Sequence, residues 1–206
     1  MLANIHDALA QVRTLKSIVM ERGFFRGYSG NARITSGSVA MMGSIILSMP
    51  SVPDDPQTHL LGWGLVLGIA VLANYGALAY WFVSDPEVKR DPIHLAPAMD
   101  AIPALCVGAG LSAVLVRSGQ YDALFGTWMA LYGLAQVAYR RTLPGRIHKI
   151  GLAYVACGMA YLVVPGMRFT NPWPMGIVFF TGEWAGGAVL LKAAADRLKK
   201  EQRSSS

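Results

Sequence analysis

Glu183 is the residue of this chain whose position most strongly suggests chemistry. It stands about ten residues into the apolar segment 174–191, and no basic residue is near it in the sequence. A charge at the centre of a bilayer costs about 2.5–3.5 kcal/mol, so a carboxyl group there is expected to face the interior of a helix bundle, where it can be protonated. Glu183 is therefore a candidate for an intramembrane site that exchanges a proton or binds a cation.

Glu183 could instead hold helices together as a neutral acid that is hydrogen-bonded to a polar side chain of another segment. The candidate partners are Asn74, Tyr75, Thr127 and Tyr132. Both interpretations are compatible with the sequence.

Two further polar residues lie within apolar segments. Asp100 stands about one turn into 97–116, where a helix N-terminus favours a carboxylate and the membrane interface is within reach. Asn74 lies inside 60–83 and needs a hydrogen-bond partner there. The predicted intramembrane polar site comprises, in chain order, Asn74, Tyr75, Asp100, Tyr132 and Glu183.

No motif of catalytic or metal-binding chemistry accompanies these residues. The sequence contains no Gly-rich phosphate loop, no HExxH, no GxSxG and no Ser–His–Asp arrangement. His94 and His148 could meet at one end of the bundle, but no spacing motif supports a metal or haem site. Cys106 and Cys157 lie within apolar segments, where free thiols are usual. We predict a protein that is not an enzyme, with no catalytic residue, no cofactor and no bound metal.

Six apolar segments determine the fold class. Apolar residues make up 53% of the chain and charged residues 15%, and the apolar residues gather in blocks that are nearly free of charge. Crossing a bilayer takes about 20 such residues. Inside lipid every backbone polar group must be paired within its own segment, so each block should be a helix. We therefore predict an all-α fold, a polytopic membrane protein with six transmembrane helices at 34–49, 60–83, 97–116, 123–139, 150–164 and 174–191.

The basic residues predict how these segments are oriented. Of the 18 Lys and Arg residues, 16 fall on one side of the six segments, and Arg33 is counted among those that precede the first. The two exceptions are Arg117 and Arg168. The positive-inside rule then places both termini in the cytoplasm, in a bacterial cytoplasmic (inner) membrane. The net charge of +6 follows from this topology and from attraction to anionic lipid, so nucleic acid is not a predicted partner.

The chain divides into three parts around these segments. Residues 1–28 should contain a cytoplasmic amphipathic helix, because apolar residues recur there at steps of three and four with charges between them. Residues 29–192 should form the six-helix bundle, with tight loops and an up-and-down topology. Residues 193–206 form a charged cytoplasmic tail, which should begin as a continuation of the last span.

Small residues at four-residue spacing are the predicted packing positions. They let helix backbones approach closely in lipid, where no hydrophobic force drives association. Contacts within the chain are the default expectation, and contacts with another protein are the alternative. The steps, two of the GxxxG type, join Gly64 to Gly68, Ala73 to Ala77 and Gly182 to Gly186.

The order of these parts resembles a group of small, functionally uncharacterised six-helix bacterial membrane proteins. The resemblance rests on Met20-Glu21-Arg22, on the turn from Ser29-Gly30-Asn31 into the first span, and on Leu115-Val116-Arg117-Ser118-Gly119 followed by Trp128 and Leu131-Tyr132-Gly133. Members of the group often place a His in the Gly-rich centre of span six, where this chain has Glu183-Trp184. The resemblance implies a six-span topology and no established activity.

Two functional hypotheses follow. In the first, the protein has no enzymatic activity and acts by association, as an accessory subunit of a membrane complex or as a homo-oligomer. It predicts that Gly68→Leu or Gly186→Leu disrupts assembly, while Glu183→Gln changes little. In the second, the protein is a small transporter or channel, and Glu183→Gln abolishes flux.

Overall fold

The computed structural model describes residues 28–84, 102–138 and 143–204. Within these residues the chain is entirely helical, as the sequence predicts, and contains no strand. The elements are α2 (Gly30–Leu47), α3 (Pro56–Ser84), α5 (Ile102–Arg117), the short 3-10 helix η3 (Tyr121–Ala123), α6 (Leu124–Ala138), α7 (Gly145–Val163) and α8 (Trp173–Ser204). The predicted amphipathic helix in 1–28 falls almost wholly outside the described residues, and Asp100 also lies outside them.

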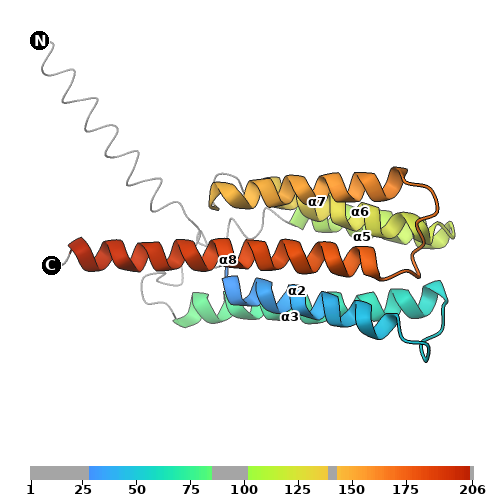
Figure 1. Cartoon of the computed structure of the whole chain (residues 1–206), viewed down its shortest axis with the longest axis horizontal. Helices are drawn as coiled ribbons and strands as arrows, with labels where there is room; N and C mark the ends of the chain where they lie inside the picture. Colours follow the sequence, from blue (N-terminus) through green and yellow to red (C-terminus); the bar gives the residue numbers. More distant parts are fainter. Residues whose placement is uncertain (1–27, 85–101, 139–142, 205–206) are drawn as a thin grey trace, which may run out of the picture.

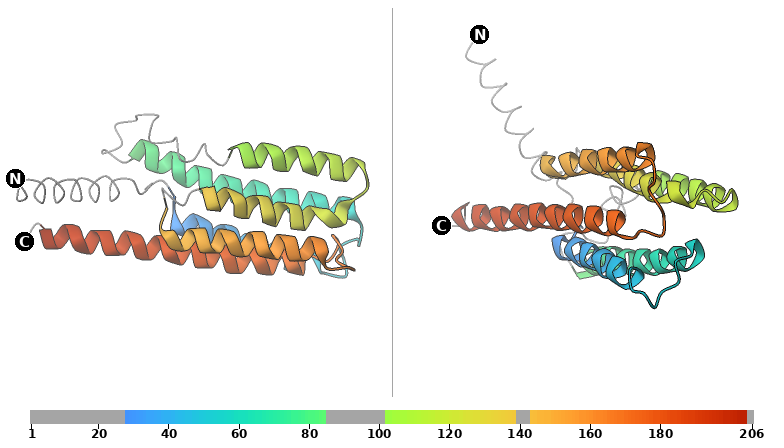
Figure 2. Two further views of the ribbon diagram at one scale, coloured as in Figure 1. Left: turned by 90° about the horizontal axis from the view of Figure 1, so that it is seen from above. Right: turned by 45° about the vertical axis from the view of Figure 1, so that its right-hand side comes forward.

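The helices run alternately up and down along one common direction (Figure 1). The connections 48–55, 118–123 and 164–172 lie together at one end of the bundle, which we call the loop end. The start of α2 and the end of α8 lie toward the opposite end, which we call the terminal end. Helix α8 continues beyond the other helices there, so that 193–204 project from the bundle (Figures 1 and 2).

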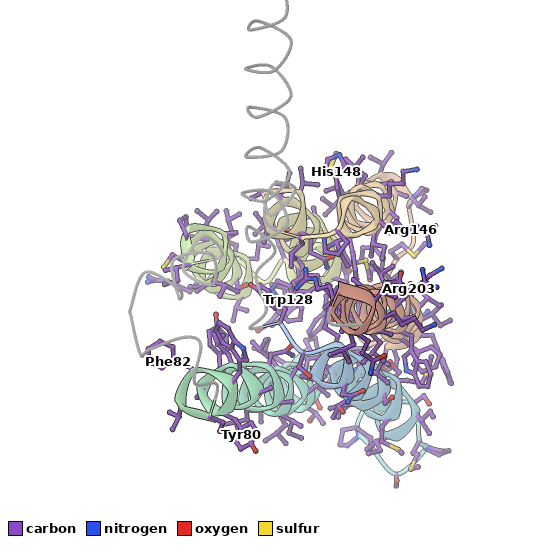
Figure 3. The ribbon with its side chains drawn as sticks, turned by 90° about the vertical axis from the view of Figure 1, so that its left-hand side faces the viewer. Tyr80, Phe82, Trp128, Arg146, His148 and Arg203 are labelled. Carbon is purple, nitrogen blue, oxygen red and sulfur yellow. The ribbon has the colours of Figure 1, made fainter. Side chains whose placement is uncertain are left out.

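The long helices that the structure describes form two groups of three. Helix α2 lies between α3 and α8, and helix α6 lies between α5 and α7. Contacts between α7 and α8 join the two groups. Figure 3 looks along the bundle from the terminal end and shows α3 and α5 at its margin.

Glycines spaced by seven residues explain the closest contact, between α6 and α7. Gly126 and Gly133 on α6 face Gly158 and Gly151 on the antiparallel α7. A Cβ atom at Gly133 would lie 2.5 Å from the carbonyl oxygen of Gly151, and one at Gly158 would lie 2.6 Å from the backbone nitrogen of Ala130. The two backbones therefore touch, and the seven-residue spacing is that of helices wound in a left-handed sense.

An aromatic core joins the two groups near the loop end. The Phe125 ring on α6 lies 5.4 Å from the Trp63 ring on α3, 5.8 Å from Tyr161 and 4.7 Å from Phe169. Phe125 and Phe169 are fully buried. Aromatic pairs at these separations stabilise a core beyond the apolar area that they bury.

Two aspartates fix the connections at the loop end. Asp122 accepts a hydrogen bond from the backbone N–H of Phe169 at 2.7 Å. Asp55 directly precedes α3 and accepts hydrogen bonds from the backbone N–H groups of Gln57 and Thr58, both at 3.0 Å. Hydrogen bonds from Thr58, by its side chain first and its backbone second, hold the pKa of Asp55 below its ordinary value of 3.8.

Two helices are long and apolar enough to cross a membrane, Pro56–Ser84 and Trp173–Lys199. The remaining predicted spans also form helices, but these are shorter or more polar. Helices α5 and α6 have 16 and 15 residues, and α2 contains Arg33 with several serines. The first turns of α7 contain Arg146, His148 and Lys149. Among the described residues, two helices therefore have the length and composition needed to cross a membrane, and the six-span arrangement is left as a hypothesis.

Part of the exposed surface is apolar, and several polar side chains are buried. The most exposed apolar side chains include Leu61, Leu65 and Leu72 on α3, which are 72%, 71% and 75% exposed. Charged and polar side chains are buried instead, and these are Arg33, Ser36, Ser44, His59, Gln136 and Glu183. Monomeric soluble proteins rarely expose contiguous apolar surface on this scale.

Candidate functional site

Glu183 is paired with an arginine that is 150 residues away in the chain. Arg33 lies in the first turn of α2, and its Nε donates to Glu183 Oε2 at 2.9 Å while its Nη2 donates to Oε1 at 2.7 Å. Arg33 is 5% exposed and Glu183 is 2% exposed. The two side chains therefore form a buried bidentate ion pair between the first and last described helices.

Three neutral side chains of the other helix group complete the site. Tyr132 of α6 and Tyr154 of α7 donate from their hydroxyl groups to Glu183 Oε1, at 2.9 and 3.1 Å. Gln136 of α6 accepts a hydrogen bond from Arg33 Nη2 at 3.2 Å. We call these five residues, Arg33, Tyr132, Gln136, Tyr154 and Glu183, the buried polar cluster. It links α2, α6, α7 and α8, and so connects the two helix groups.

Glycines on α8 and α2 make room for this cluster. A Cβ atom at Gly186 would lie 2.6 Å from Arg33 Cζ, and one at Gly182 would overlap the ring of Tyr154. A Cβ atom at Gly37 would lie 2.9 Å from the Cβ of Glu183. The predicted packing pair Gly182 and Gly186 therefore admits side chains of the same chain. Gly186→Leu, proposed above as a test of assembly, would instead displace Arg33.

Hydrogen-bond donors surround the carboxyl group of Glu183. It accepts four hydrogen bonds, two of them from the guanidinium of Arg33. Neither interpretation of Glu183 from the sequence included a basic partner. Arg33 was counted with the cytoplasmic flank, whereas in the structure α2 begins at Gly30 and Arg33 is buried. Pairing offsets the cost of burying each charge alone.

The other predicted partners and site residues that the structure describes do not join the cluster. Asn74 donates from Nδ2 to Ser36 Oγ at 2.7 Å and to the carbonyl oxygen of Ala70 at 2.9 Å, and so ties α3 to α2. Tyr75 is 42% exposed. Thr127 donates to the carbonyl oxygen of Ala123 in its own helix at 2.8 Å. Among the four expected partners of Glu183, Tyr132 is the one that contacts it.

Sequence reasoning missed Arg33, Gln136 and Tyr154. A signal for Arg33 exists, because it shares a helix face with Ser36, Gly37, Ala40 and Ser44, all of them small and buried. Such a face lets a neighbouring helix approach and leaves room for one long side chain. Gln136 and Tyr154 carry no comparable signal, since only the α6–α7 contact brings them to Glu183.

The predicted packing positions on α3 behave differently from those on α8. A Cβ atom at Gly64 or Gly68 would meet nothing within 4 Å in the described structure, so the default expectation of packing within the chain is not observed there. Ala73 and Ala77 are half-buried. The Gly64–Gly68 step therefore faces outward.

A few buried polar atoms have no hydrogen-bond partner among the described residues. They include Gln136 Nε2 in the buried polar cluster, together with His59 Nδ1, Trp63 Nε1 and His148 Nδ1. The described residues contain no group of three or more His, Cys, Asp or Glu side chains that could hold a metal ion. Among the described residues, the buried polar cluster is therefore the candidate functional site, because it combines buried charges with several hydrogen-bonding side chains.

The buried polar cluster is thus an ion pair whose two charged groups are held in place by side chains of several helices. Its carboxylate is held by side chains from α2, α6 and α7, and the guanidinium of Arg33 is held by side chains from α6 and α8. Removing one charge from such a buried pair typically costs about 3–5 kcal/mol. In comparisons with known proteins, no family model, no curated protein and no solved structure matches this chain.

Proposed function

We propose that this chain is an integral protein of the bacterial cytoplasmic membrane, with six helical spans and both termini in the cytoplasm. We further propose that it acts by association, either as an accessory subunit of a membrane complex or as a homo-oligomer, and not as an enzyme. The lipid bilayer and other membrane subunits, or further copies of the chain, are then its partners.

The distribution of polar groups supports the membrane placement. Leucines cover the outer surface of α3, while the charges of Arg33 and Glu183 are paired inside the bundle. A charge inside the hydrocarbon is tolerated when it faces the bundle interior and has a partner. This pairing allows α2 to count as a span although it contains Arg33.

The charges at the two ends support the orientation. Exposed cations gather toward the terminal end on α7 and α8, beside one exposed acid, Asp196, and these cations are Arg146, Lys149, Lys192, Lys199 and Arg203. The loop end has a mixture of both signs, namely Asp54, Asp55, Arg117, Asp122 and Arg168. An excess of Lys and Arg marks the cytoplasmic side of a membrane protein, so the terminal end is assigned to the cytoplasm.

The outward face of α3 is the observation that carries the proposal of association. The helix has 29 residues and packs along α2 on one side. The Gly64–Gly68 step is open, and Leu61, Leu65 and Leu72 stand out around it. Open GxxxG steps in lipid favour close contact with another helix.

The experiment is native mass spectrometry of the chain extracted gently from its own membranes. We expect a stoichiometric partner or a second copy with the wild type, and its loss in Gly68→Leu. Gly110→Leu is the matched control, because Gly110 lies on α5 and is equally open. A wild type that is monomeric, or a Gly68→Leu variant with unchanged assembly, would contradict association through α3.

Transport at Glu183 is the second candidate, and the unpartnered amide of Gln136 favours it. Gln136 is 4% exposed, contacts Arg33, and leaves Nε2 without a partner among the described residues. A transported solute that carries a hydrogen-bond acceptor could use that donor. Flux of protons, of cations and of such a polar solute into proteoliposomes tests this function, with Tyr154→Phe as the variant that keeps the ion pair and changes the ligands of Glu183. Wild-type flux no greater than that of empty liposomes would exclude the ions tested.

A further inference from the structure

The exposed face of α7 ends in two cations that have no ion-pair partner among the described residues. Arg146 and Lys149 lie three residues apart in the first turns of the helix, and both are exposed. In Figure 3 Arg146 lies on the outer side of α7. No acidic side chain of the described residues lies within ion-pair distance of either residue, and α7 itself contains no Asp or Glu.

This arrangement of charge is unfavourable in the chain by itself. Like charges three residues apart on a helix repel each other. The N-terminal end of a helix carries partial positive charge, which also disfavours cations there. An anion beside Arg146 and Lys149 would relieve both effects.

The remainder of the same face is apolar and made of small residues. Steps of three and four residues continue from Arg146 and Lys149 through exposed positions to the loop end, and these are Ala153, Ala156, Ala160 and Val163. From Lys149 to Val163 the helix rises by about 21 Å, which exceeds the roughly 15 Å of one hydrocarbon leaflet. The face therefore presents cations at one end and a shallow apolar strip along the rest.

We infer that this face of α7 binds an anionic phospholipid, with its phosphate between Arg146 and Lys149 and an acyl chain along the alanines. The inference rests on the proposed membrane placement, in which the terminal end meets the cytoplasmic leaflet. The two cations favour a negatively charged headgroup. The apolar strip favours a lipid over a soluble anion, because an acyl chain can pack along it. Juxtamembrane cations attract anionic lipid by about fivefold in affinity for each charge, so two should contribute about 30-fold.

The experiment uses the full chain, purified and placed in nanodiscs of phosphatidylcholine with increasing phosphatidylglycerol. Native mass spectrometry then counts the lipids that remain bound. We expect the wild type to retain phosphatidylglycerol preferentially, and the double variant Arg146→Gln, Lys149→Gln to lose about 30-fold of that preference. The control Arg117→Gln, Arg168→Gln removes two cations near the loop end and should retain it.

Two results would overturn the inference. One is retention of phosphatidylglycerol by the double variant at the wild-type level. The other is displacement of the lipid by inorganic phosphate, which would indicate a site for small anions. Resistance of the wild type to carbonate extraction tests the membrane placement separately. The oligomeric state of the double variant tests association separately. A failure of the lipid site can therefore be distinguished from a failure of the membrane placement or of association.

Discussion

Replacing Glu183 with Gln leaves the guanidinium of Arg33 buried without a counter-charge. The substitution preserves the volume of the side chain, and the hydroxyl groups of Tyr132 and Tyr154 can still donate to the amide oxygen. The amide nitrogen, however, then faces Arg33 Nε, which donated to the carboxylate at 2.9 Å. The hydrogen bond from Arg33 Nε is therefore lost, and the one from Arg33 Nη2 to the retained oxygen no longer meets a negative charge.

The expected loss of stability is about 3 kcal/mol. Hydrogen bonds to charged groups contribute about 1.5–3 kcal/mol each, and removing one partner of a buried ion pair costs about 3–5 kcal/mol. We use the lower end of the range of about 3–5 kcal/mol because Arg33 lies near the N-terminal end of α2, where its long side chain can shift toward the membrane interface. In a chain of this size, about 3 kcal/mol lowers the unfolding midpoint by about 6–12 °C.

A double-mutant cycle measures this pair directly. Glu183→Gln, Arg33→Gln and the double variant are unfolded with SDS in mixed micelles, and their free energies of unfolding are compared. We expect each single variant to be destabilised and the double variant to recover about 2 kcal/mol of the summed loss, because two glutamines can hydrogen-bond to each other. Asp196→Asn is the control, since it removes an exposed carboxylate from the same helix. Single variants within about 0.5 kcal/mol of the wild type, or strictly additive losses, would refute the ionised pair.

Three further predictions concern other parts of the molecule. Gly133→Leu should separate α6 from α7 and abolish the folded protein in membranes, because its side chain would meet the backbone of α7; normal expression with an unchanged unfolding midpoint would contradict this contact. Hydrogen bonds from Thr58 lower the pKa of Asp55, so the contribution of Asp55 to stability is present above pH 3.8 and is lost as the pH falls below that value. Unfolding midpoints measured against pH should show this loss of stability in acid for the wild type and a smaller loss for Asp55→Asn. Cys106 and Cys157 are exposed on the apolar surface, so in intact membranes they should react with a lipid-soluble maleimide and resist a charged one; equal labelling by both reagents would contradict the proposed spans.

The contacts of Glu183 and Gly186 within the chain decide which variants can report on association. Gly186 and Glu183 belong to one internal cluster, so variants there report on folding of the chain. Gly64 and Gly68 have no close neighbour among the described residues, and variants there can report on partners. Variants on the outward face of α3 therefore test the association hypothesis.

The sequence by itself determined the local features of this protein. Helix formation follows from apolar blocks that must satisfy their backbone hydrogen bonds internally, and it is observed in every predicted span that the structure describes. The prominence of Glu183 also follows locally, because a carboxyl group inside an apolar segment needs a partner wherever it lies. Tyr132 was correctly included among its possible partners.

The tertiary structure alone decided what Glu183 meets and which glycines face inward. Arg33 is separated from Glu183 by 150 residues, and no local pattern encodes which helices become neighbours. Glycine spacing likewise does not specify a direction, so Gly182 and Gly186 enclose a cluster while Gly64 and Gly68 face outward. The physical reason is that hydrogen bonding within a helix depends on residues four apart, whereas ion pairing and helix packing depend on the relative rotation and order of whole helices.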